Sequence, residues 1–425
     1  MPAEKAIRTV VQVYFTAVLF LMYYFVSEAI FIGGIGITLR HVFALVVIFS
    51  AFLYFLIRPD VPRAAVSLKS ALVFGMPLLV IVLSSMLVWV IDRSAVSTIM
   101  RGLSGCLVYT NILSCALTAG AVMYVFGEDG IWWNLAALLG ANLLMIFSVM
   151  LSDGVGTFMR EFVQLILSFA GNTGDTIIKA EIHELAFCLG AYLIYMLYKP
   201  RKKLWFWVMF ALAVFCFLAA FKRIAILAMA AVAVLRILFF AVARLSDRAV
   251  CRAANTVMLL TCVLLVGYIW VIKLDVFSAL EKLGIDTSGR AFVYSHVNTY
   301  YDFSPLFPGR GIGFLTYQLN EEVSLGVQAV HNDFLQFYID LGFFGYILWL
   351  LSMTVLRTSY FGKSDAGSAV LCMLLMLYLV IVSSTDNTLN YPLLTTVTGV
   401  LMIGNGYAQK VKRKADDLDA HPLLL

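Results

Sequence analysis

Long apolar runs, separated by short polar stretches, recur along the whole chain. A helix needs about 20 apolar residues to cross the hydrocarbon core of a bilayer. Runs of roughly this kind occupy residues 10–30, 41–57, 71–91, 104–126, 131–151, 182–198, 204–221, 224–243, 256–274, 333–356, 366–384 and 392–408. Their continuous apolar character favours helices over the alternating strands of a membrane barrel. The pattern predicts an all-α integral membrane protein with about 12 transmembrane helices in one polytopic domain, residues 1–425.

Composition supports the same class of protein. Hydrophobic residues make up 62% of the chain and charged residues 13%, whereas about 25% of residues are charged in soluble domains. The first run lacks a small-residue cleavage site, so we expect a retained span and not a removable signal peptide. The seven cysteines form no C-x-x-C pair and support neither a zinc site nor a disulfide framework.

The distribution of basic residues predicts the topology. With a cytoplasmic N-terminus, 18 lysines and arginines lie in the inner segments and 11 in the outer ones. The positive-inside rule therefore favours both termini in the cytoplasm, with residues 410–425 as a solvated tail. Because the net charge of +5 follows this topology, it gives no reason to expect a nucleic-acid partner.

Two outer loops are long, residues 152–181 and 275–332. Long loops in compact proteins are usually functional or disordered. The second loop, between the ninth and tenth spans, is rich in aromatic residues, so we expect it to fold over the outer face. We find no convincing internal repeat, which weakens an inverted-repeat transporter as an alternative.

A pair of cations interrupts the longest apolar stretch. The 40 residues between Lys203 and Arg244 would form a helix of about 60 Å, twice the thickness of a hydrocarbon core. The stretch must therefore fold back, and its midpoint places Lys222 and Arg223 at the tip of a tight hairpin on the outer face. These cations either extend to lipid head groups or hold a phosphate, which the arginine fork binds in a bidentate manner.

Two further arginines lie in the second outer loop, Arg290 and Arg310. The surrounding segment Gly309-Arg-Gly-Ile-Gly313 is no dinucleotide fingerprint, because it has no strand–turn–helix context. Its glycines permit close backbone turns near a bound group. The three arginines are able to converge on one diphosphate.

A histidine stands at the outer end of the tenth span. Helical spacing puts His331, Tyr338, Gly342 and Gly345 near one face, and the two glycines would let that face approach a neighbouring helix closely. His331 either anchors the helix at the interface, with Asn332 as a capping residue, or acts as a general base.

Two other outer polar patches are less specific. His183-Glu184 is not a zinc-protease motif, because Phe187 occupies the position four after the histidine. Glu184 is expected on a polar face, where it could hydrogen-bond a sugar. Asp386 begins a third polar patch.

The outer loops carry no acidic D-x-D cluster, and arginine can provide the charge stabilisation usually given by a metal, so we expect no metal or other cofactor.

Several of these residues stand in an ordered set. The set is Arg223 with Leu227, Ser288-Gly-Arg290, Gly311-Ile-Gly313, and His331-Asn332 with Leu335, Gly342 and Gly345. Over about residues 200–350 it resembles the O-antigen ligase and O-antigen or exopolysaccharide polymerase family of bacterial membrane proteins. The resemblance implies a GT-C-type bundle and a metal-independent, inverting glycosyltransferase. It also implies undecaprenyl-diphosphate-linked glycans as substrates, at the outer face of the inner membrane.

Carried over by position, the resemblance implies that Arg223 and Arg290 hold the donor diphosphate and that His331 activates the acceptor hydroxyl. Lys222 and Arg310 are further candidates for the diphosphate, and Asn332, Glu184 and Asp386 for the glycan or acceptor. The chain departs from the ligase pattern, which expects threonine where Gly345 stands. We therefore favour a polymerase, with a ligase and a lipid-linked glycan transporter as alternatives. A chain-length regulator of the polysaccharide pathway is a candidate partner.

Overall fold

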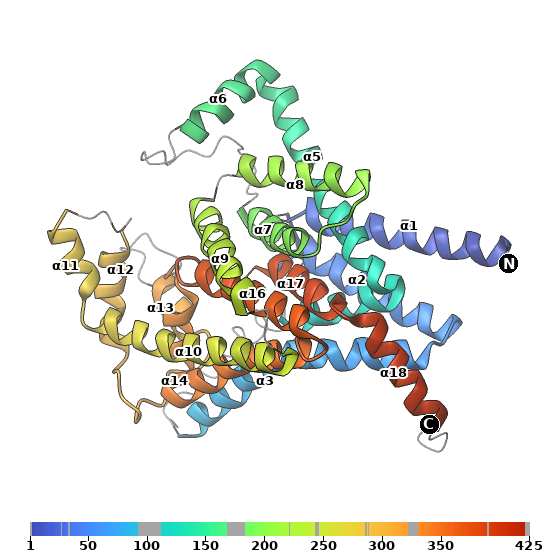
Figure 1. Cartoon of the computed structure of the whole chain (residues 1–425). Coiled ribbons are helices and arrows are strands. Elements are labelled where there is room, and N and C mark those ends of the chain that lie inside the picture. The colour runs from blue at the N-terminus through green and yellow to red at the C-terminus, as the bar shows by residue number, and fades with distance from the viewer. Residues whose placement is uncertain are drawn as a thin grey trace. The chain divides into compact units, whose positions relative to one another are not determined.

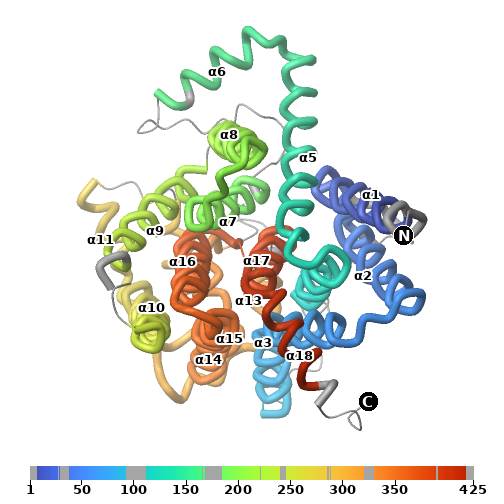
Figure 2. The backbone as a smooth tube through the Cα atoms, turned by 45° about the vertical axis from the view of Figure 1, so that its right-hand side comes forward, coloured from blue at the N-terminus to red at the C-terminus, as the bar shows by residue number. Residues whose placement is uncertain are grey.

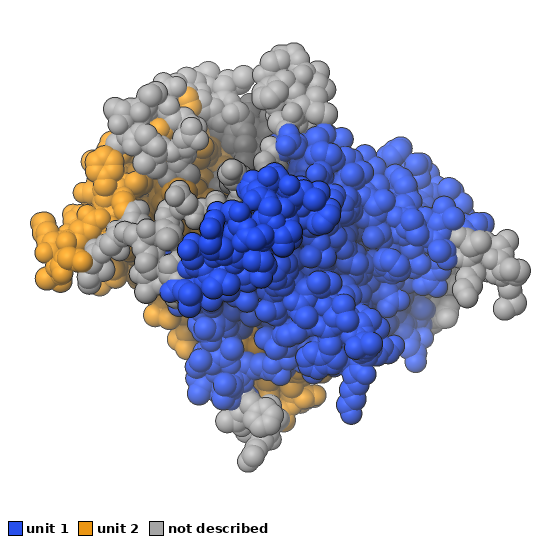
Figure 3. Space-filling view, turned by 90° about the horizontal axis from the view of Figure 1, so that it is seen from above, with its two compact units in different colours: residues 1–72, 114–240, 392–425 blue, residues 73–113, 241–391 orange. Residues whose placement is uncertain are grey.

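A computed structural model describes residues 2–26, 28–32, 35–91, 112–167, 183–220, 222–242, 246–284, 287, 289–321, 330–388 and 391–420 (Figure 1). Among the predicted features, Ser288 and the loop segments 168–181 and 322–329 lie outside these residues. The chain divides into two units. Unit 1 comprises residues 1–72, 114–240 and 392–425, and unit 2 comprises residues 73–113 and 241–391 (Figure 3).

Unit 1 is helical except for one hairpin in its described part. Its helices are α1 (Pro2–Tyr24), α2 (Leu39–Ile57), α3 (Val61–Ile91) up to Leu72, a helix over 112–126, α5 (Gly130–Asp153), α6 (Val155–Leu167), α7 (His183–Tyr198), α8 (Leu204–Ala220), α9 (Arg223–Val242), α17 (Pro392–Gly404) and α18 (Tyr407–Ala420). Helix α1 packs against α2 and α5, and α7 packs against α8 and α17 (Figure 2).

Unit 2 contains the remainder of α3 and the segment that follows α9. Its elements are α10 (Asp247–Lys273), α11 (Val276–Lys282), α12 (Arg290–Val297), a 3₁₀ turn (Asn298–Tyr300), α13 (Phe314–Glu321), α14 (Asp333–Leu351), a π-helical turn (Ser352–Leu356), α15 (Arg357–Phe361) and α16 (Ala366–Ser383). Helix α10 packs against both α14 and α16. Contacts of His331 and Asn332 with residues 386–387 place the start of α14 beside the turn that follows α16.

The helical membrane class predicted from the apolar runs is confirmed. Seven helices in the described part are long and apolar enough to cross a bilayer, and three shorter apolar helices accompany them. The exact number of 12 spans stays a prediction. The apolar helix over 112–153 holds 42 residues, and it is divided near the predicted polar interruption by a 3₁₀ turn over Gly127–Asp129. Gly127 has a φ of +65°, a conformation that few residues other than glycine adopt.

The first apolar run is shorter as a helix than predicted. Helix α1 ends at Tyr24, and the run continues into strand β1 (Ala29–Ile32), which pairs antiparallel with β2 (Ile35–Thr38). Ile30 lies opposite Ile37 in this hairpin. The β-branched isoleucines of the hairpin favour strand over helix, so the end predicted at residue 30 is wrong.

The break predicted at Lys222 and Arg223 is confirmed, but the tight hairpin is wrong. Helix α8 ends at Ala220 and α9 begins at Arg223. Helix α8 packs against α7 and α5, and α9 diverges from it instead of returning along it (Figures 1 and 2).

The loop over residues 275–332 is folded in its described part, as its aromatic content predicts. It contains α11, α12 and α13. Phe277 packs edge-on against Tyr294, with ring centroids 4.9 Å apart, and Phe307 stacks on Tyr338 of α14 at 5.6 Å. The other long loop begins with α6. Both segments therefore consist largely of short helices where they are described.

Candidate active site

The candidate site begins at the residue that precedes α14. His331 has a φ of +52°, in the left-handed region that few non-glycine residues occupy. Asn332 follows as the N-cap, and its Oδ1 atom accepts a hydrogen bond from the backbone N–H of Leu335 at 3.1 Å. The cap predicted for Asn332 is therefore present. The sharp turn at His331 directs the chain into α14 and leaves the imidazole exposed over 60% of its side-chain surface.

The Asn332 side chain is fully buried and engaged on every side. Its Nδ2 atom donates to the hydroxyls of Tyr268 and Tyr294, each at 3.1 Å, and its backbone N–H donates to Oδ1 of Asn387 at 3.1 Å. Burial raises the pKa of Tyr294, so this hydroxyl keeps its proton at neutral pH. Asn332 thus orients the start of α14. Its predicted contact with a glycan stays a prediction.

His331 faces a carboxylate from another segment of unit 2. The Nδ1 atom of His331 lies 3.5 Å from Oδ1 of Asp386, a separation longer than an ordinary hydrogen bond of about 2.9 Å. Asp386 keeps only 10% of its side chain exposed. Its Oδ1 atom also accepts hydrogen bonds from the backbone N–H of Asn387 at 2.8 Å and from the hydroxyl of Tyr391 at 3.2 Å. These bonds fix the carboxylate beside the imidazole.

Arg290 joins the same cluster through the neighbouring residue of the Asp386 segment. One terminal nitrogen of its guanidinium donates to the carbonyl oxygen of Thr385 at 2.9 Å. Its Nε atom is buried and has no hydrogen-bond partner among the described residues. The Nε–H group of Arg290 is therefore able to donate a hydrogen bond to a bound group, next to the turn that carries Asp386.

One turn of three consecutive residues thus contacts three of the predicted site residues. Thr385 contacts Arg290, Asp386 contacts His331, and Asn387 contacts Asn332. For the residue triplet 385–387 we use the name triad turn. Because it follows α16, the packing of α16 and α14 on α10 sets its position. The triad turn gathers a titratable base, its carboxylate and a permanent cation into one cluster.

The cluster of His331, Asp386 and Arg290 is suited to proton transfer next to a positive charge. A histidine whose Nδ1 faces a carboxylate is oriented with Nε2 available, and the carboxylate stabilises the imidazolium formed when Nε2 takes a proton. The guanidinium of Arg290 adds a positive charge with planar hydrogen-bond donors to the same cluster. Among the described residues, no group of three or more His, Cys, Asp or Glu side chains could hold a metal ion.

A second structural device fixes the loop that carries Arg310. Helix α14 is interrupted at Gly342, which has a φ of +73° and a ψ of −179°. The opening receives residues 307–311: the backbone N–H groups of Arg310 and Gly311 donate to the carbonyls of Ile339 and Asp340, at 2.9 and 2.8 Å. A side chain on Gly342 would overlap the backbone of Pro308. The predicted role of Gly342 in close helix packing is therefore wrong, because it accommodates this loop.

The side chain of Asp340 also anchors the loop that carries Arg310. Its carboxylate is fully buried and accepts the backbone N–H groups of Gly313 at 3.1 Å and Leu315 at 3.3 Å. Gly345 behaves as predicted and approaches a neighbouring helix, since a Cβ atom there would lie 2.8 Å from Oγ of Ser84 in α3. Of the glycines near Arg310, Gly309 packs against the backbone of α14 and Gly311 lies against Trp89 of α3.

The side chain of Arg310 is exposed at the surface of this loop. Its Nε atom donates to the carbonyl oxygen of Tyr300 at 3.0 Å, and its guanidinium lies 5.9 Å from the ring centroid of Phe314. The loop places Arg310 in unit 2 with Arg290 and His331. It takes no part in the triad-turn contacts of those two residues.

The remaining predicted residues belong to unit 1. Lys222 precedes α9 and Arg223 is its exposed first residue. Glu184 lies in the first turn of α7, 5% exposed, and pairs with Arg40 at 2.8 Å while also accepting the backbone N–H of Leu393. Its predicted sugar contact and the convergence of the three arginines stay predictions.

Sequence reasoning missed several residues of the site. Tyr268 and Tyr294 carry no signal that separates them from the other aromatic residues of the chain. Asp340 was detectable as a carboxylate within an apolar span, a location that is usually functional or structural. Asn387 adjoins Asp386 in the polar patch, but the sequence does not indicate its contact with Asn332.

The fold and the site define a helical, multi-pass membrane protein with a polar site at the start of one apolar helix. Residues 208–350 match the family model described as O-Antigen ligase. This segment includes Arg223, Arg290 and His331, and it ends before the triad turn. Over this segment the match confirms the predicted resemblance to O-antigen ligases and polymerases. A comparison with curated proteins finds no match.

Proposed function

We propose that this protein is a bacterial inner-membrane glycosyltransferase that polymerises undecaprenyl-diphosphate-linked oligosaccharide repeat units. The observation that carries the proposal is the His331–Asp386 contact, with Arg290 held at the same turn. Both termini would lie in the cytoplasm and the site would face the outer side of the membrane. The positive-inside distribution of basic residues supports this orientation.

The proposed reaction begins with the acceptor sugar. The Nε2 atom of His331 takes the proton of an acceptor hydroxyl, whose oxygen attacks the anomeric carbon of the donor glycan. The new glycosidic bond forms as the bond from that carbon to the diphosphate oxygen breaks. The diphosphate leaves with the bonding electron pair, and the proton remains on His331 beside Asp386. Attack opposite to the leaving group inverts the anomeric configuration.

The negative charge that develops on the diphosphate requires cations. Arg290 has an unsatisfied buried donor, and Arg310 presents an exposed guanidinium from the same unit. By the resemblance, Lys222 and Arg223 at the start of α9 are also assigned to the donor diphosphate. Preorganised cations of this kind can replace a metal ion in stabilising a leaving group. The proposal therefore includes activity without a divalent metal.

Two outcomes of the transfer fit the same site. The description of the matching family favours a ligase, which would move a finished glycan to lipid A core or another acceptor. Gly345, which stands where the ligase pattern expects threonine, favours a polymerase. Because Gly345 packs closely against Ser84, a threonine there would not fit without movement of α3.

The test is reconstitution of the purified chain in nanodiscs with lipid-linked repeat units, with and without a lipid A core acceptor, in excess EDTA. A ladder of products that differ by one repeat would support polymerisation. A single product on the core acceptor would favour the ligase, and loss of activity restored by a divalent ion would reject metal independence. Movement of intact donor across the bilayer, with no new glycosidic bond, would reject the glycosyltransferase proposal.

A further inference from the structure

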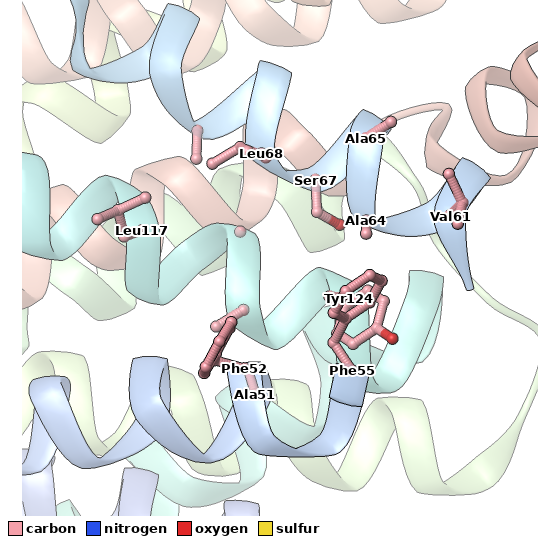
Figure 4. Close-up of a pocket in the computed structure, with 13 residues that line it drawn as sticks. Ala51, Phe52, Phe55, Val61, Ala64, Ala65, Ser67, Leu68, Leu117 and Tyr124 are labelled. Atoms are coloured by element: carbon pink, nitrogen blue, oxygen red, sulfur yellow. The ribbon is translucent and has the colours of Figure 1, made fainter. Parts of the chain in front are cut away.

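A groove lies in unit 1 between α2, α3 and the helix over 112–126 (Figure 4). Its volume of about 380 Å³ falls within the range of about 300–1,000 Å³ that is usual for ligand pockets. Phe52 and Phe55 line it from α2, Ala65 and Leu68 from α3, and Leu117 from the third helix. Phe52 and Leu68 are each 54% exposed, so the groove opens toward a surface suited to lipid.

The wall of the groove is almost entirely apolar. Only Ser67 and Tyr124 contribute side-chain polar groups, and both are already bonded within the protein. The Ser67 hydroxyl lies 2.6 Å from the hydroxyl of Tyr407, and the Tyr124 hydroxyl donates to the carbonyl of Arg58 at 3.1 Å. A sugar or nucleotide would lose its hydration here without gaining hydrogen bonds. The groove therefore suits a hydrocarbon chain.

One end of the groove is basic. Val61 lines this end, between Arg58 at the end of α2 and Arg63 in the first turn of α3. Helix α18 starts at the same end, because the Tyr407 hydroxyl donates to the carbonyl of Arg63 at 3.2 Å. It adds the cations Lys410, Lys412, Arg413 and Lys414. Part of this charge is offset by Asp60, which caps the backbone N–H of Arg63 at 3.0 Å, by Glu128, which accepts the backbone N–H of Ala408 at 3.0 Å, and by Asp416 and Asp417 of α18. Six cations against four carboxylates leave this end positive.

We propose that the groove binds an anionic phospholipid, with one acyl chain between α2 and α3 and the phosphate at Arg58 and Arg63. Apolar walls next to a cationic end match the two parts of such a lipid. Arginine pairs well with phosphate, and basic pockets between membrane helices on the cytoplasmic side favour anionic head groups. The basic-residue distribution puts the turn between α2 and α3 on that side. This site shares no residue with the proposed active site.

The same charge arrangement distinguishes the occupant from the lipid-linked donor. The donor diphosphate must reach His331, which the predicted topology puts on the outer face. The same topology assigns the turn that carries Arg58 and Arg63 to the cytoplasmic side. A helix from a second copy of the chain would fill the apolar groove but would leave the basic end without an anion. An anionic phospholipid satisfies both ends.

The test uses the full chain in nanodiscs that contain a phosphatidylglycerol with a photoactivatable acyl chain, followed by mapping of the labelled peptides. We expect labelling of α2 and α3 around Ala65 that exceeds labelling by the matching phosphatidylcholine. Ala65→Phe fills the groove and should abolish this excess, whereas Ala233→Phe at an exposed position of α9 should preserve it. Arg58→Gln and Arg63→Gln should each lower phosphatidylglycerol labelling about fivefold.

Three results would overturn the proposal. One is equal labelling by the two phospholipids in the wild-type chain. Another is labelling that Ala65→Phe leaves unchanged while its thermal unfolding midpoint matches that of Ala233→Phe. The third is that undecaprenyl phosphate competes with the photoactivatable lipid as effectively as unlabelled phosphatidylglycerol does. This result would assign the groove to the carrier lipid. Glycan transfer is not the readout, so the proposal is tested separately from the proposed function.

Discussion

The Nδ1 atom of His331 lies 3.5 Å from the Oδ1 atom of Asp386, across 55 positions of the sequence. Asp386 is held by Asn387 and Tyr391, and the next residue of the turn holds Asn332, the cap of α14. A single turn after α16 therefore fixes both the position of the imidazole and the carboxylate it faces. Predictions about catalysis follow from this contact.

Asp386→Asn should lower kcat with little change in KM for the acceptor. The amide keeps the size of the side chain but cannot stabilise the imidazolium, so transfer should fall by about 100-fold or more. Steady-state kinetics on lipid-linked substrate check this, with Asp386→Glu expected to recover part of the rate. If Asp386→Asn retains the kcat of the wild type, the carboxylate has no catalytic relation to His331.

Arg290→Lys should weaken the donor interaction although it preserves the charge. The guanidinium of Arg290 contacts Thr385 with one nitrogen and keeps Nε for a second hydrogen bond, whereas lysine has no such planar fork. We therefore expect an increase in donor KM of roughly tenfold. Arg252→Lys, at an exposed position of α10, is the matched control and should behave as the wild type. Equal KM values for the two variants would remove Arg290 from the donor site.

Gly342→Ala should destabilise unit 2. The alanine must adopt a φ of +73° and its Cβ would overlap Pro308. The free energy of unfolding should therefore fall by more than the roughly 1–3 kcal/mol that an ordinary strained residue costs. Gly267→Ala in α10 has open space around it and should raise stability by about 1 kcal/mol. Thermal unfolding in detergent compares the two. A higher midpoint for Gly342→Ala would contradict the described opening of α14.

Glu184→Ala should destabilise unit 1, because it leaves Arg40 partly buried without its carboxylate. Removal of one partner of a buried ion pair costs about 3–5 kcal/mol, and the 20% exposure of Arg40 should reduce this to on the order of 2 kcal/mol. The double variant with Arg40→Ala should recover part of the loss. Strict additivity of the two single changes would show that the pair is not coupled.

Much of the helical organisation was predictable because apolar runs of spanning length have few alternatives in a bilayer. The break between α8 and α9 followed from length alone. Hydropathy could not predict that α1 gives way to a hairpin before residue 30, because isoleucine is apolar in either structure. It also could not predict the direction in which α9 leaves α8 (Figure 1).

The site was predictable in part for a different reason. His331 and Arg290 were recognisable as polar residues at unusual places in an apolar chain. Asp386 was visible only as a polar patch, since nothing in its neighbourhood encodes a contact 55 positions away. The interruption of α14 was concealed, because Gly342 is compatible both with close helix packing and with a positive φ. Only the hydrogen bonds of the Arg310 loop separate these possibilities.

The most direct test of the central claim is glycan transfer by the purified chain in nanodiscs, measured for the wild type, His331→Ala and His296→Ala. His296 in α12 is the matched control, a histidine that contacts Tyr300 and lies outside the triad-turn contacts. We predict that the wild type and His296→Ala extend the lipid-linked repeat and that His331→Ala, folded to the same extent, does not. Equal extension by all three would contradict a base at His331.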